Sequence, residues 1–451
     1  MIYRTMSHRL PVLCVLLACS PLTAQQAPAA HPLFEGDAVH EIRLTFSQPD
    51  WWARLRANFE GQADPTYLEA SFDWGETHFD TIGVRFKGNS SYRSYPGDKK
   101  SFKIKLNAFV KGQKVAGIDS LNLNNAFKDP SFVREKVYYE LAVEAGLAAP
   151  RVNHAAVYIN GEYWGLYFLV EGVDSAFLES RFGKKESGNL YKGDPQGTLQ
   201  WRGPAVQPYR NMFEKENNED ADDWSDLVKL IDTLNNQPLD ALRGVLDVDS
   251  AAALLALDLL TVNLDSYIGS GHNYYLYHRV SDGRFVLMPW DPNEAWGNFN
   301  LGIPIEQLRR LPLNFMPQPM GPPGQPPPPQ PPGGSRPLAS KLWADPDTRA
   351  AYRDKVRSLL AGAAHPDTLL ARMQALRDLV RPWVEMDVKK MYPTSQFESC
   401  FLEDFLPRPV GPPLPGGPNP PPNPGGGMPI PGLSPFIRER AVFLSGELEK
   451  P

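Results

Sequence analysis

The sequence predicts an α+β fold, with an antiparallel sheet in its first part, a mainly helical second part and one β-hairpin inside that second part. Three observations carry the prediction. Short segments that alternate apolar and polar residues dominate up to residue 172, apolar residues at helical spacing dominate from residue 173, and an Asp-Gly pair at 282–283 separates two segments rich in β-forming residues. With 451 residues, the chain is long enough to bury a core divided between two lobes.

The first part divides into strands joined by turns and two helices. Alternation of apolar and polar residues predicts the strands, and an Asn-Gly pair at 160–161 predicts the turn of a hairpin. The expected strands are 40–46, 67–72, 82–87, 101–106 and the two arms of a hairpin over 152–171, with helices at 49–57 and 132–145.

The strand at 101–106 has one apolar face and one basic face, because three apolar residues alternate with polar residues that include Lys103. Arg85 and Lys87 lie on the preceding strand, and Lys100 lies at the entry of this one. Two interpretations stay open. The basic face is either a surface that binds phosphate or a solvated edge strand that is protected by lysines.

The second part consists of helices interrupted by two proline-rich tracts. The tracts at 317–337 and 407–433 cannot form regular ladders of hydrogen bonds, so we interpret them as extended surface inserts. Apolar residues at helical spacing predict the helices. These are expected at 221–234, 239–246, 247–262, 345–360, 366–387 and 435–448.

The charge balance argues against nucleic-acid binding, and the cysteine count argues against an intrachain disulfide. The chain has 46 Lys+Arg against 52 Asp+Glu, a net charge of -6, so it lacks the basic excess of a nucleic-acid-binding protein. Cys14 and Cys19 lie in the N-terminal segment, which leaves Cys400 without a partner for an intrachain disulfide. We therefore expect Cys400, which is close to two phenylalanines, to be a small buried hydrophobic residue.

The N-terminus predicts export from a bacterial cell. Arg4 and Arg9 precede an apolar segment at 10–18 that is too short to span a bilayer. Two cleavage sites compete. The sequence Leu-Leu-Ala-Cys resembles a lipobox, which would make Cys19 the lipidated first residue and anchor the chain to a membrane, whereas cleavage after Ala24 would release the chain.

The hairpin is central to the functional hypothesis. If Ser281 faces Arg284 across the turn, residues whose numbers sum to 565 are paired. Asn273 and Asp291 then meet at the open end of the hairpin, beside the loop that carries Asp265. Mg²⁺ takes few protein oxygens and completes its coordination with water and phosphate, so these three side chains suit a magnesium site. The alternative is an ordinary hairpin flanked by carboxylates.

Eight short motifs follow one another between residues 82 and 297. They are 85–91 (RFKGNSS), 99–105 (KKSFKIK), 134–136 (REK), 165–171 (GLYFLVE), 189–192 (NLYK), 263–265 (NLD), 273–277 (NYYLY) and 289–291 (PWD). In this order they resemble the CotH kinase family, the spore-coat-protein-H-like atypical kinases of bacteria and some fungi. No single motif is decisive, whereas the ordered set is specific.

The resemblance implies a divergent, two-lobed protein-kinase-like fold that binds ATP with Mg²⁺ or Mn²⁺ and transfers the γ-phosphoryl group to protein Ser or Thr, including its own. It implies that Asp265 orients or deprotonates the acceptor hydroxyl and that Asn273 and Asp291 hold the metal ion. Glu135 would pair with a strand lysine, although an acid in a first helical turn also complements the helix dipole. The residues placed beside the nucleotide are Arg85, Lys100, Lys103, Glu135 and Glu171, the last of them in the hinge between the lobes.

Two features depart from the family's pattern. Many members carry a second acid two residues past the metal-binding Asp, where this chain has Asn293 followed by Glu294, which predicts a weaker Mg²⁺ site. An exported protein also meets little ATP, so the alternative function is a surface or adhesion protein that keeps the fold without catalysis.

The chain is therefore expected to contain a signal segment, a linker, two lobes, two inserts and C-terminal helices. The expected boundaries are 1–24 (signal), 25–39 (linker), 40–172 (first lobe, with the nucleotide site), 173–316 (second lobe, with the catalytic and metal residues), 317–337 (insert), 338–406 (helices), 407–433 (insert) and 434–451 (terminal helix).

Overall fold

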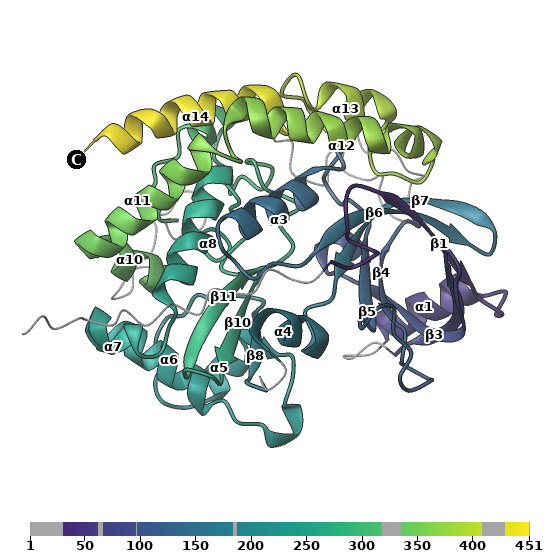
Figure 1. Ribbon diagram of the computed structural model, residues 1–451, viewed down its shortest axis with the longest axis horizontal. Coiled ribbons are helices and arrows are strands. Elements are labelled where there is room, and N and C mark those ends of the chain that lie inside the picture. Colours follow the sequence, from purple (N-terminus) through teal and green to yellow (C-terminus); the bar gives the residue numbers. More distant parts are fainter. Residues whose placement is uncertain are drawn as a thin grey trace, which may run out of the picture.

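The alternating strands of the first part close into a seven-stranded barrel, on the right in Figure 1. The computed structural model describes residues 30–61, 66–95, 97–183, 187–317, 335–407 and 429–450. Neighbouring strands are antiparallel except β1 and β6, which run parallel and close the barrel. The order around the barrel is β1 (Val39–Thr45), β2 (Leu68–Trp74), β3 (Thr77–Lys87), β4 (Ser101–Lys105), β5 (Ser120–Asn124), β7 (Glu162–Glu171) and β6 (Val152–Ile159).

The strands of the barrel present one apolar face and one polar face. Val84 and Phe86 of β3 are inaccessible to solvent and pack inside the barrel. Arg85 and Lys87 alternate with them and lie outside, opposite Lys103 and Ser101 of β4. Phe102 and Ile104 of β4 are buried in the same core, so the expected division of this strand into a core face and a basic face is confirmed. The alternative of an edge strand is wrong, because β4 pairs with β3 on one side and with β5 on the other.

The second part is built on a four-stranded sheet surrounded by helices. The sheet has the order β11 (Arg284–Pro289), β10 (Tyr274–Arg279), β8 (Leu190–Gly193) and β9 (Phe213–Lys215). Helix α8 (Val248–Thr261) is buried along its length and contacts β11, α3 (Arg134–Glu144) and α11 (Pro346–Ala361). A near-continuous apolar sequence forms a helix buried on most sides, with Asp249 exposed, as the sequence predicts for this segment.

The remaining helices cover the barrel and the sheet (Figure 1). In chain order they are α1 (Trp51–Glu60), α2 (Ser90–Arg93), α4 (Ser175–Phe182), α5 (Gln207–Arg210), a 3₁₀ helix (Glu219–Ala221), α6 (Ser225–Asn236), α7 (Leu239–Arg243), α9 (Ile305–Arg309), α10 (Pro337–Ala344), α12 (Pro366–Met386), α13 (Thr394–Ser399) and α14 (Leu433–Glu449).

The register of the β10–β11 hairpin differs from the prediction by two residues. Arg279 pairs with Arg284 and Tyr274 with Pro289, so paired numbers sum to 563 and four residues form the loop. The Asp282 carboxylate holds Arg279 at 2.5 Å and Arg284 at 2.6 Å, which fixes this wider loop. A shift of two residues leaves every side chain on the face that was predicted, because the pleat repeats every two residues.

The α+β class is confirmed, whereas the antiparallel sheet expected for the first part is corrected to a closed barrel with one parallel pair. Cys400 is fully buried, as expected, and burial raises the pKa of its thiol to about 12. The expected signal segment, with Cys19, and most of both proline-rich tracts lie outside the described residues. Within the described part of the chain, every helix is too short or too polar to cross a membrane.

Candidate active site

A polar cavity of about 350 Å³ lies where the outer face of the barrel meets α3 and the open end of the β10–β11 hairpin. Its walls come from segments far apart in the sequence: the ends of β3 and β5 with the loops that follow them, the first turn of α3, β8, and the loops on either side of the hairpin. The charged residues that line it are Lys87, Glu135, Lys192, Asp194, Asp265, Asp291 and Glu294.

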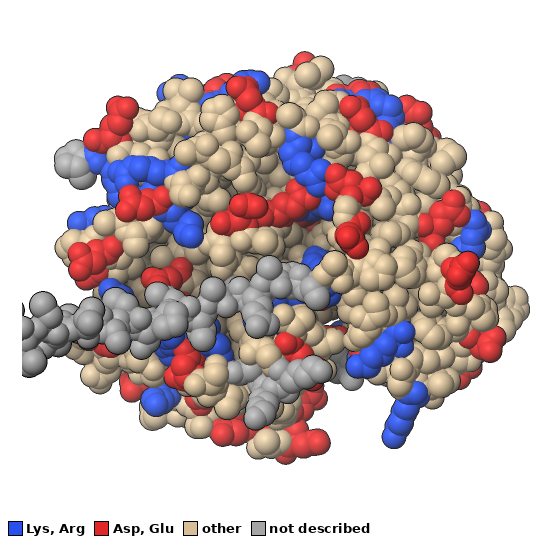
Figure 2. Space-filling view, in the orientation of Figure 1, with Lys and Arg blue, Asp and Glu red and all other residues tan. Residues whose placement is uncertain are grey.

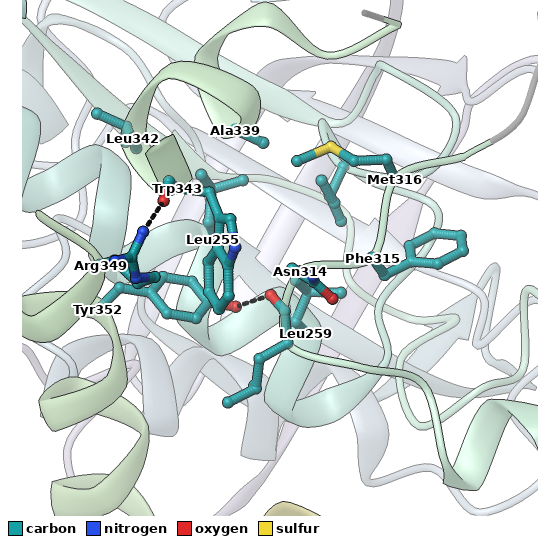
Figure 3. A pocket seen from close by; sticks show the side chains of 12 residues that line it. Leu255, Leu259, Asn314, Phe315, Met316, Ala339, Leu342, Trp343, Arg349 and Tyr352 are labelled. Carbon is teal, nitrogen blue, oxygen red and sulfur yellow. Dashed lines mark hydrogen bonds between the residues drawn. The ribbon is translucent and has the colours of Figure 1, made fainter. Parts of the chain in front are cut away.

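A second pocket, between α8, α10 and α11, is apolar (Figure 3). Of the described residues that line it, Arg349 alone is charged, and its guanidinium donates to the Trp343 carbonyl at 2.9 Å. Functional sites combine an apolar wall with converging polar groups, which this pocket lacks. We therefore place the candidate site in the polar cavity.

Lys87, the last residue of β3, supplies the cation of the barrel wall. Its Nζ donates to Asn124 Oδ1 at 2.8 Å and lies 5.3 Å from the centre of the Trp290 ring. Burial lowers the pKa of Lys87, while the carboxylates of Asp291 and Glu135 act in the opposite direction. Burial thus disfavours the charged form of Lys87, and the two acids that it faces offset part of this effect.

Glu135 projects from the first turn of α3 into the same cavity. Asn124 Nδ2 donates to its Oε1 at 2.7 Å, and its other oxygen is buried with no hydrogen-bond donor among the described residues. Burial, and then the nearby charge of Asp291, raise the pKa of Glu135 to about 8. Glu135 lines the cavity, as a site residue would, but it contacts the strand lysine Lys87 through the Asn124 amide and not directly.

Asp265 and Asn273 are brought together as expected. Asn273 Nδ2 donates to the Asp265 carbonyl at 3.0 Å and to Asp265 Oδ2 at 3.1 Å. Because the nitrogen of the Asn273 amide is engaged in this way, the amide oxygen is the atom left for a cation. His272 Nε2 lies 2.5 Å from Asp265 Oδ1, so the carboxylate has a partner on each oxygen.

Asp291 lies just past the end of β11 and also lines the cavity. Its backbone N–H donates to Tyr139 Oη of α3 at 3.0 Å. Burial raises the pKa of Asp291, Lys87 lowers it and Asp265 raises it. Asp291 and Asn273 both have left-handed backbone conformations, with φ of 50° and 56°. Such conformations are uncommon outside glycine and concentrate at functional sites.

The segment after Asp291 forms a further wall. Asn293 Nδ2 donates to the Phe127 carbonyl at 2.8 Å, which leaves its side-chain oxygen as the group able to meet a ligand. Glu294 is paired with Lys128, whose Nζ lies 3.0 Å from Oε2. Burial raises the pKa of Glu294 to about 7, against the effect of Lys128. The position two residues past Asp291 therefore carries an amide, and the carboxyl that follows it is already paired with Lys128.

Four residues expected beside the nucleotide lie outside the wall of the polar cavity. The Lys100 ammonium donates to the carbonyls of Tyr92 and Tyr95. Lys103 and Arg85 face each other across β4 and β3. The buried Glu171 carboxylate forms salt bridges with Arg151, at 2.6 Å, and with Arg181, at 2.7 Å.

Three residues of the cavity were not singled out from the sequence as site residues. Lys87 was one of several basic residues on the predicted strand, and only its place at the end of β3 puts it in the cavity. Asn124 lies on β5, a short strand that the pattern did not reveal. His272 directly precedes Asn273. Because Asn273 was predicted to bind the metal ion, this adjacency in sequence could have pointed to His272.

Acidic residues outnumber lysines in the wall of the polar cavity. Five acidic residues line it against the two lysines Lys87 and Lys192. Lys192 is itself paired, with Nζ 2.6 Å from Asp194 Oδ2. Carboxylate and amide oxygens are hard donors, which suit Mg²⁺ or Mn²⁺. An anionic ligand such as a polyphosphate fits this acidic cavity when cations accompany it, because like charges repel at short range.

Over the molecular face shown in Figure 2, acidic and basic side chains are interspersed.

The chain is similar to proteins of one known family. The family model "CotH kinase protein" matches residues 84–405, which is well over half of the chain. The chain belongs to the CotH kinase family. The matched range contains the last part of β3 with Lys87, the whole hairpin and the helices up to α13.

Two relatives are similar to this chain over more than half of its length. "Inner spore coat protein H" of Bacillus subtilis (strain 168) is 24% identical over 326 residues, which cover 70% of this chain and 81% of the relative. "Invasin CotH7" of Rhizopus delemar is 22% identical over 293 residues, which cover 63% of this chain and 47% of the relative. The chain thus spans about half the length of this fungal relative.

Proposed function

We propose that this member of the CotH kinase family is an atypical protein kinase that transfers the γ-phosphoryl group of ATP to Ser or Thr hydroxyls of proteins, including its own. The observation that carries the proposal is the convergence of Lys87, Asp265, Asn273 and Asp291 on one cavity. Protein kinases use a strand lysine, a loop aspartate, an asparagine and a metal-binding aspartate for this reaction. The barrel and the helical part would then act as the two lobes of a kinase-like fold.

Each residue has a role in this reaction. The bond between the γ-phosphorus and the bridging oxygen of ADP breaks, and a new P–O bond forms to the acceptor hydroxyl. Asp265 orients that hydroxyl and takes its proton. Lys87 offers a positive charge to the phosphate oxygens, a role that the family resemblance implied for Arg85, Lys100 and Lys103. His272, which is hydrogen-bonded to Asp265, holds one of the carboxylate oxygens in place.

The Asp291 carboxylate and the Asn273 amide oxygen would hold Mg²⁺ or Mn²⁺. The fit rests on the hard oxygen donors of the cavity and on its excess of carboxylates, which a divalent cation would offset. Mg²⁺ would supply the charge that allows a triphosphate to enter an acidic site. Asn293 in place of a second acid, and Glu294 paired with Lys128, favour a weak metal site that is filled together with the nucleotide.

The protein would work outside the cytoplasm, at the cell envelope or after secretion. This part of the proposal rests on the N-terminal signal-like segment and on relatives that are named as a spore coat protein and an invasin. The acceptor is a protein Ser or Thr, and no nucleic acid takes part. Lipidation at Cys19 would add an anchor to a membrane.

The deciding experiment incubates purified residues 25–451 with γ-labelled ATP and Mg²⁺ or Mn²⁺, beside Asp265→Asn and Asp291→Asn. We expect label on the parent and none on either variant. Asp282→Asn is a matched control, because Asp282 lies at the far end of the same hairpin and binds Arg279 and Arg284 instead of lining the cavity. Label on all four proteins, or on none, contradicts the proposal.

A non-catalytic surface protein is the second candidate, and the name of the fungal relative, an invasin, favours it. Nucleotide binding separates the two functions. A kinase binds ATP in a Mg²⁺-dependent manner that calorimetry detects, and Asp291→Asn weakens that binding. An adhesion protein that has lost catalysis needs no such affinity, so absence of both label and binding would favour this second function.

A further inference from the structure

The loop that carries Asp265 begins with a strained turn. Helix α8 ends at Thr261 and is capped by Val262, whose backbone is left-handed with φ of 49° and ψ of 51°. A β-branched residue rarely adopts this conformation, so the surrounding structure must hold it. The amides of Trp296 and Gly297 donate to the carbonyls of Thr261 and Val262 at 2.6 and 3.1 Å. The turn is thus held from one side by the segment that follows Asp291.

Asp258 holds the turn from the other side. It lies on the last turns of α8 and is inaccessible to solvent. Its carbonyl accepts the Asn263 N–H at 2.8 Å, and its carboxylate oxygen Oδ1 accepts from Asn263 Nδ2 at 3.0 Å. Asn263 is two residues before Asp265, so these bonds set the direction in which the loop leaves the helix.

The same carboxylate oxygen reaches the helix on the other side of the cavity. Tyr138 Oη of α3 donates to Asp258 Oδ1 at 2.5 Å. Residues three and four apart on a helix share a face, so Tyr138 and Tyr139 lie on the same side as Glu135. Glu135 lines the cavity and Tyr139 binds the Asp291 amide. One buried oxygen therefore joins the helix of Glu135 to the loop of Asp265.

We propose that Asp258 is a positioning residue of the phosphoryl-transfer site, which sets helix α3 and the Asp265 loop relative to each other through Tyr138 and Asn263. The proposal rests on the proposed function and adds to it a residue remote from the substrate. Its side chain contacts the two elements that present the acidic groups, and it lines no part of the polar cavity.

This role predicts an effect on turnover more than on binding. Misplacing a reacting group by about 1 Å costs a factor of about 100 in rate, whereas nucleotide affinity depends on groups that these bonds do not touch. Tyr138→Phe removes the bond to the helix, and Asn263→Ala removes the bond to the loop. We expect each to lower kcat by about tenfold or more with a change in nucleotide Kd of less than about twofold.

The two substitutions should also be non-additive. Both act through one carboxylate, so the double variant should lose little more activity than the worse of the single variants. Tyr352→Phe is the matched control. Tyr352 is a buried tyrosine whose hydroxyl donates to the Leu313 carbonyl at 3.0 Å, in the apolar pocket of Figure 3. The Tyr352→Phe substitution removes a similar hydrogen bond at a place away from the site, so it should leave kcat unchanged.

Hydrogen exchange tests the proposal without relying on catalysis. Tyr138→Phe should speed exchange of backbone amides in residues 263–271, although the substitution lies on α3, and Tyr352→Phe should not. If Tyr138→Phe changes exchange only within α3 and retains the parent kcat, the proposal is overturned. If the parent protein transfers no phosphate, the proposed function fails, and the exchange experiment still decides whether Asp258 connects the helix to the loop.

Discussion

Lys87 and Glu135 bind the two ends of a single amide, that of Asn124. The lysine ammonium donates to Oδ1 at 2.8 Å, and Nδ2 donates to the glutamate at 2.7 Å. Between these two described residues no ion pair forms within 4 Å. A neutral side chain thus lies between the strand cation and the helix carboxyl. In protein kinases the corresponding lysine and glutamate are in direct contact.

Removing this amide should separate the strand from the helix. In Asn124→Leu, a substitution of similar size, the Lys87 ammonium and the Glu135 carboxyl lose their common hydrogen-bond partner and are left unsatisfied in a buried site. We expect a loss of about 1–3 kcal/mol in the free energy of unfolding, together with a lower rate of phosphoryl transfer.

The control for this prediction is Asn122→Leu. Asn122 lies two residues earlier on β5, on the same face, but does not line the cavity. Urea unfolding and labelling assays on both variants provide the measurement. Equal rates of transfer for Asn124→Leu and Asn122→Leu would show that the amide bridge has no part in the reaction.

Lys87 should be the lysine on which transfer depends. Lys87→Met removes the cation that lines the cavity, and loss of one preorganised charge at a transition state costs about 10²–10³ in kcat. Lys103→Met is the comparison, since Lys103 lies on the same outer face of the barrel and was expected from the sequence to contact phosphate. We expect it to retain most of the activity. A larger loss in Lys103→Met than in Lys87→Met would return the assignment to Lys103.

Lys99 illustrates a lysine of the basic stretch that has a structural role. Its Nζ lies 2.7 Å from Asp387 Oδ2 at the end of α12, and neither side chain is accessible to solvent. Lys99→Met leaves a buried charge without its partner, which costs about 3–5 kcal/mol. Lys389→Met, which breaks a pair with the exposed Glu162, should cost about 1 kcal/mol or less. Urea unfolding measures both, and similar losses for the two variants would contradict this account.

The sequence predicted the faces of the strands better than their partners. Alternation alone put Lys103 on the polar face of its strand, because the pleat repeats every two residues, and this face is the outside of the barrel, which it shares with Arg85 and Lys87. Which of them reaches the cavity depends on where α3 and the hairpin pack, and this packing joins segments separated by more than a hundred residues. The parallel pairing of β1 with β6 also joins segments far apart in the sequence, so no local sequence pattern predicts it.

The remaining errors have local causes. The Asp-Gly pair predicted a two-residue turn, but Asp282 binds the arginines on both sides of it and a loop of four residues results. Strand β5 was missed because two of its five residues are Asn, a residue depleted in strands. These polar positions are buried because they face the cavity or its surroundings instead of solvent. Asp265, Asn273 and Asp291 were found because the hairpin alone brings them close together.

The buried Asp258 should make stability depend on pH. Burial raises the pKa of Asp258 from its usual 3.8 to about 7, and the hydrogen bond from Tyr138 only partly opposes this. A carboxyl with a higher pKa in the folded state binds its proton more tightly there than in the unfolded state. Its contribution to stability is therefore fully present below about pH 4 and is lost as the pH rises to about 7.

Asp258→Asn isolates this effect. Asparagine can still accept the hydrogen bonds of Tyr138 and Asn263 through its oxygen, but it carries no titrating proton. Between pH 5 and pH 7 the parent should therefore lose stability relative to the variant, by up to about 1.4 kcal/mol for each pH unit. Urea unfolding of both proteins at several pH values measures the difference. Tyr352→Phe, an uncharged change in the same core, should keep a constant offset from the parent, and a constant offset for Asp258→Asn as well would show that Asp258 titrates alike in the folded and unfolded states.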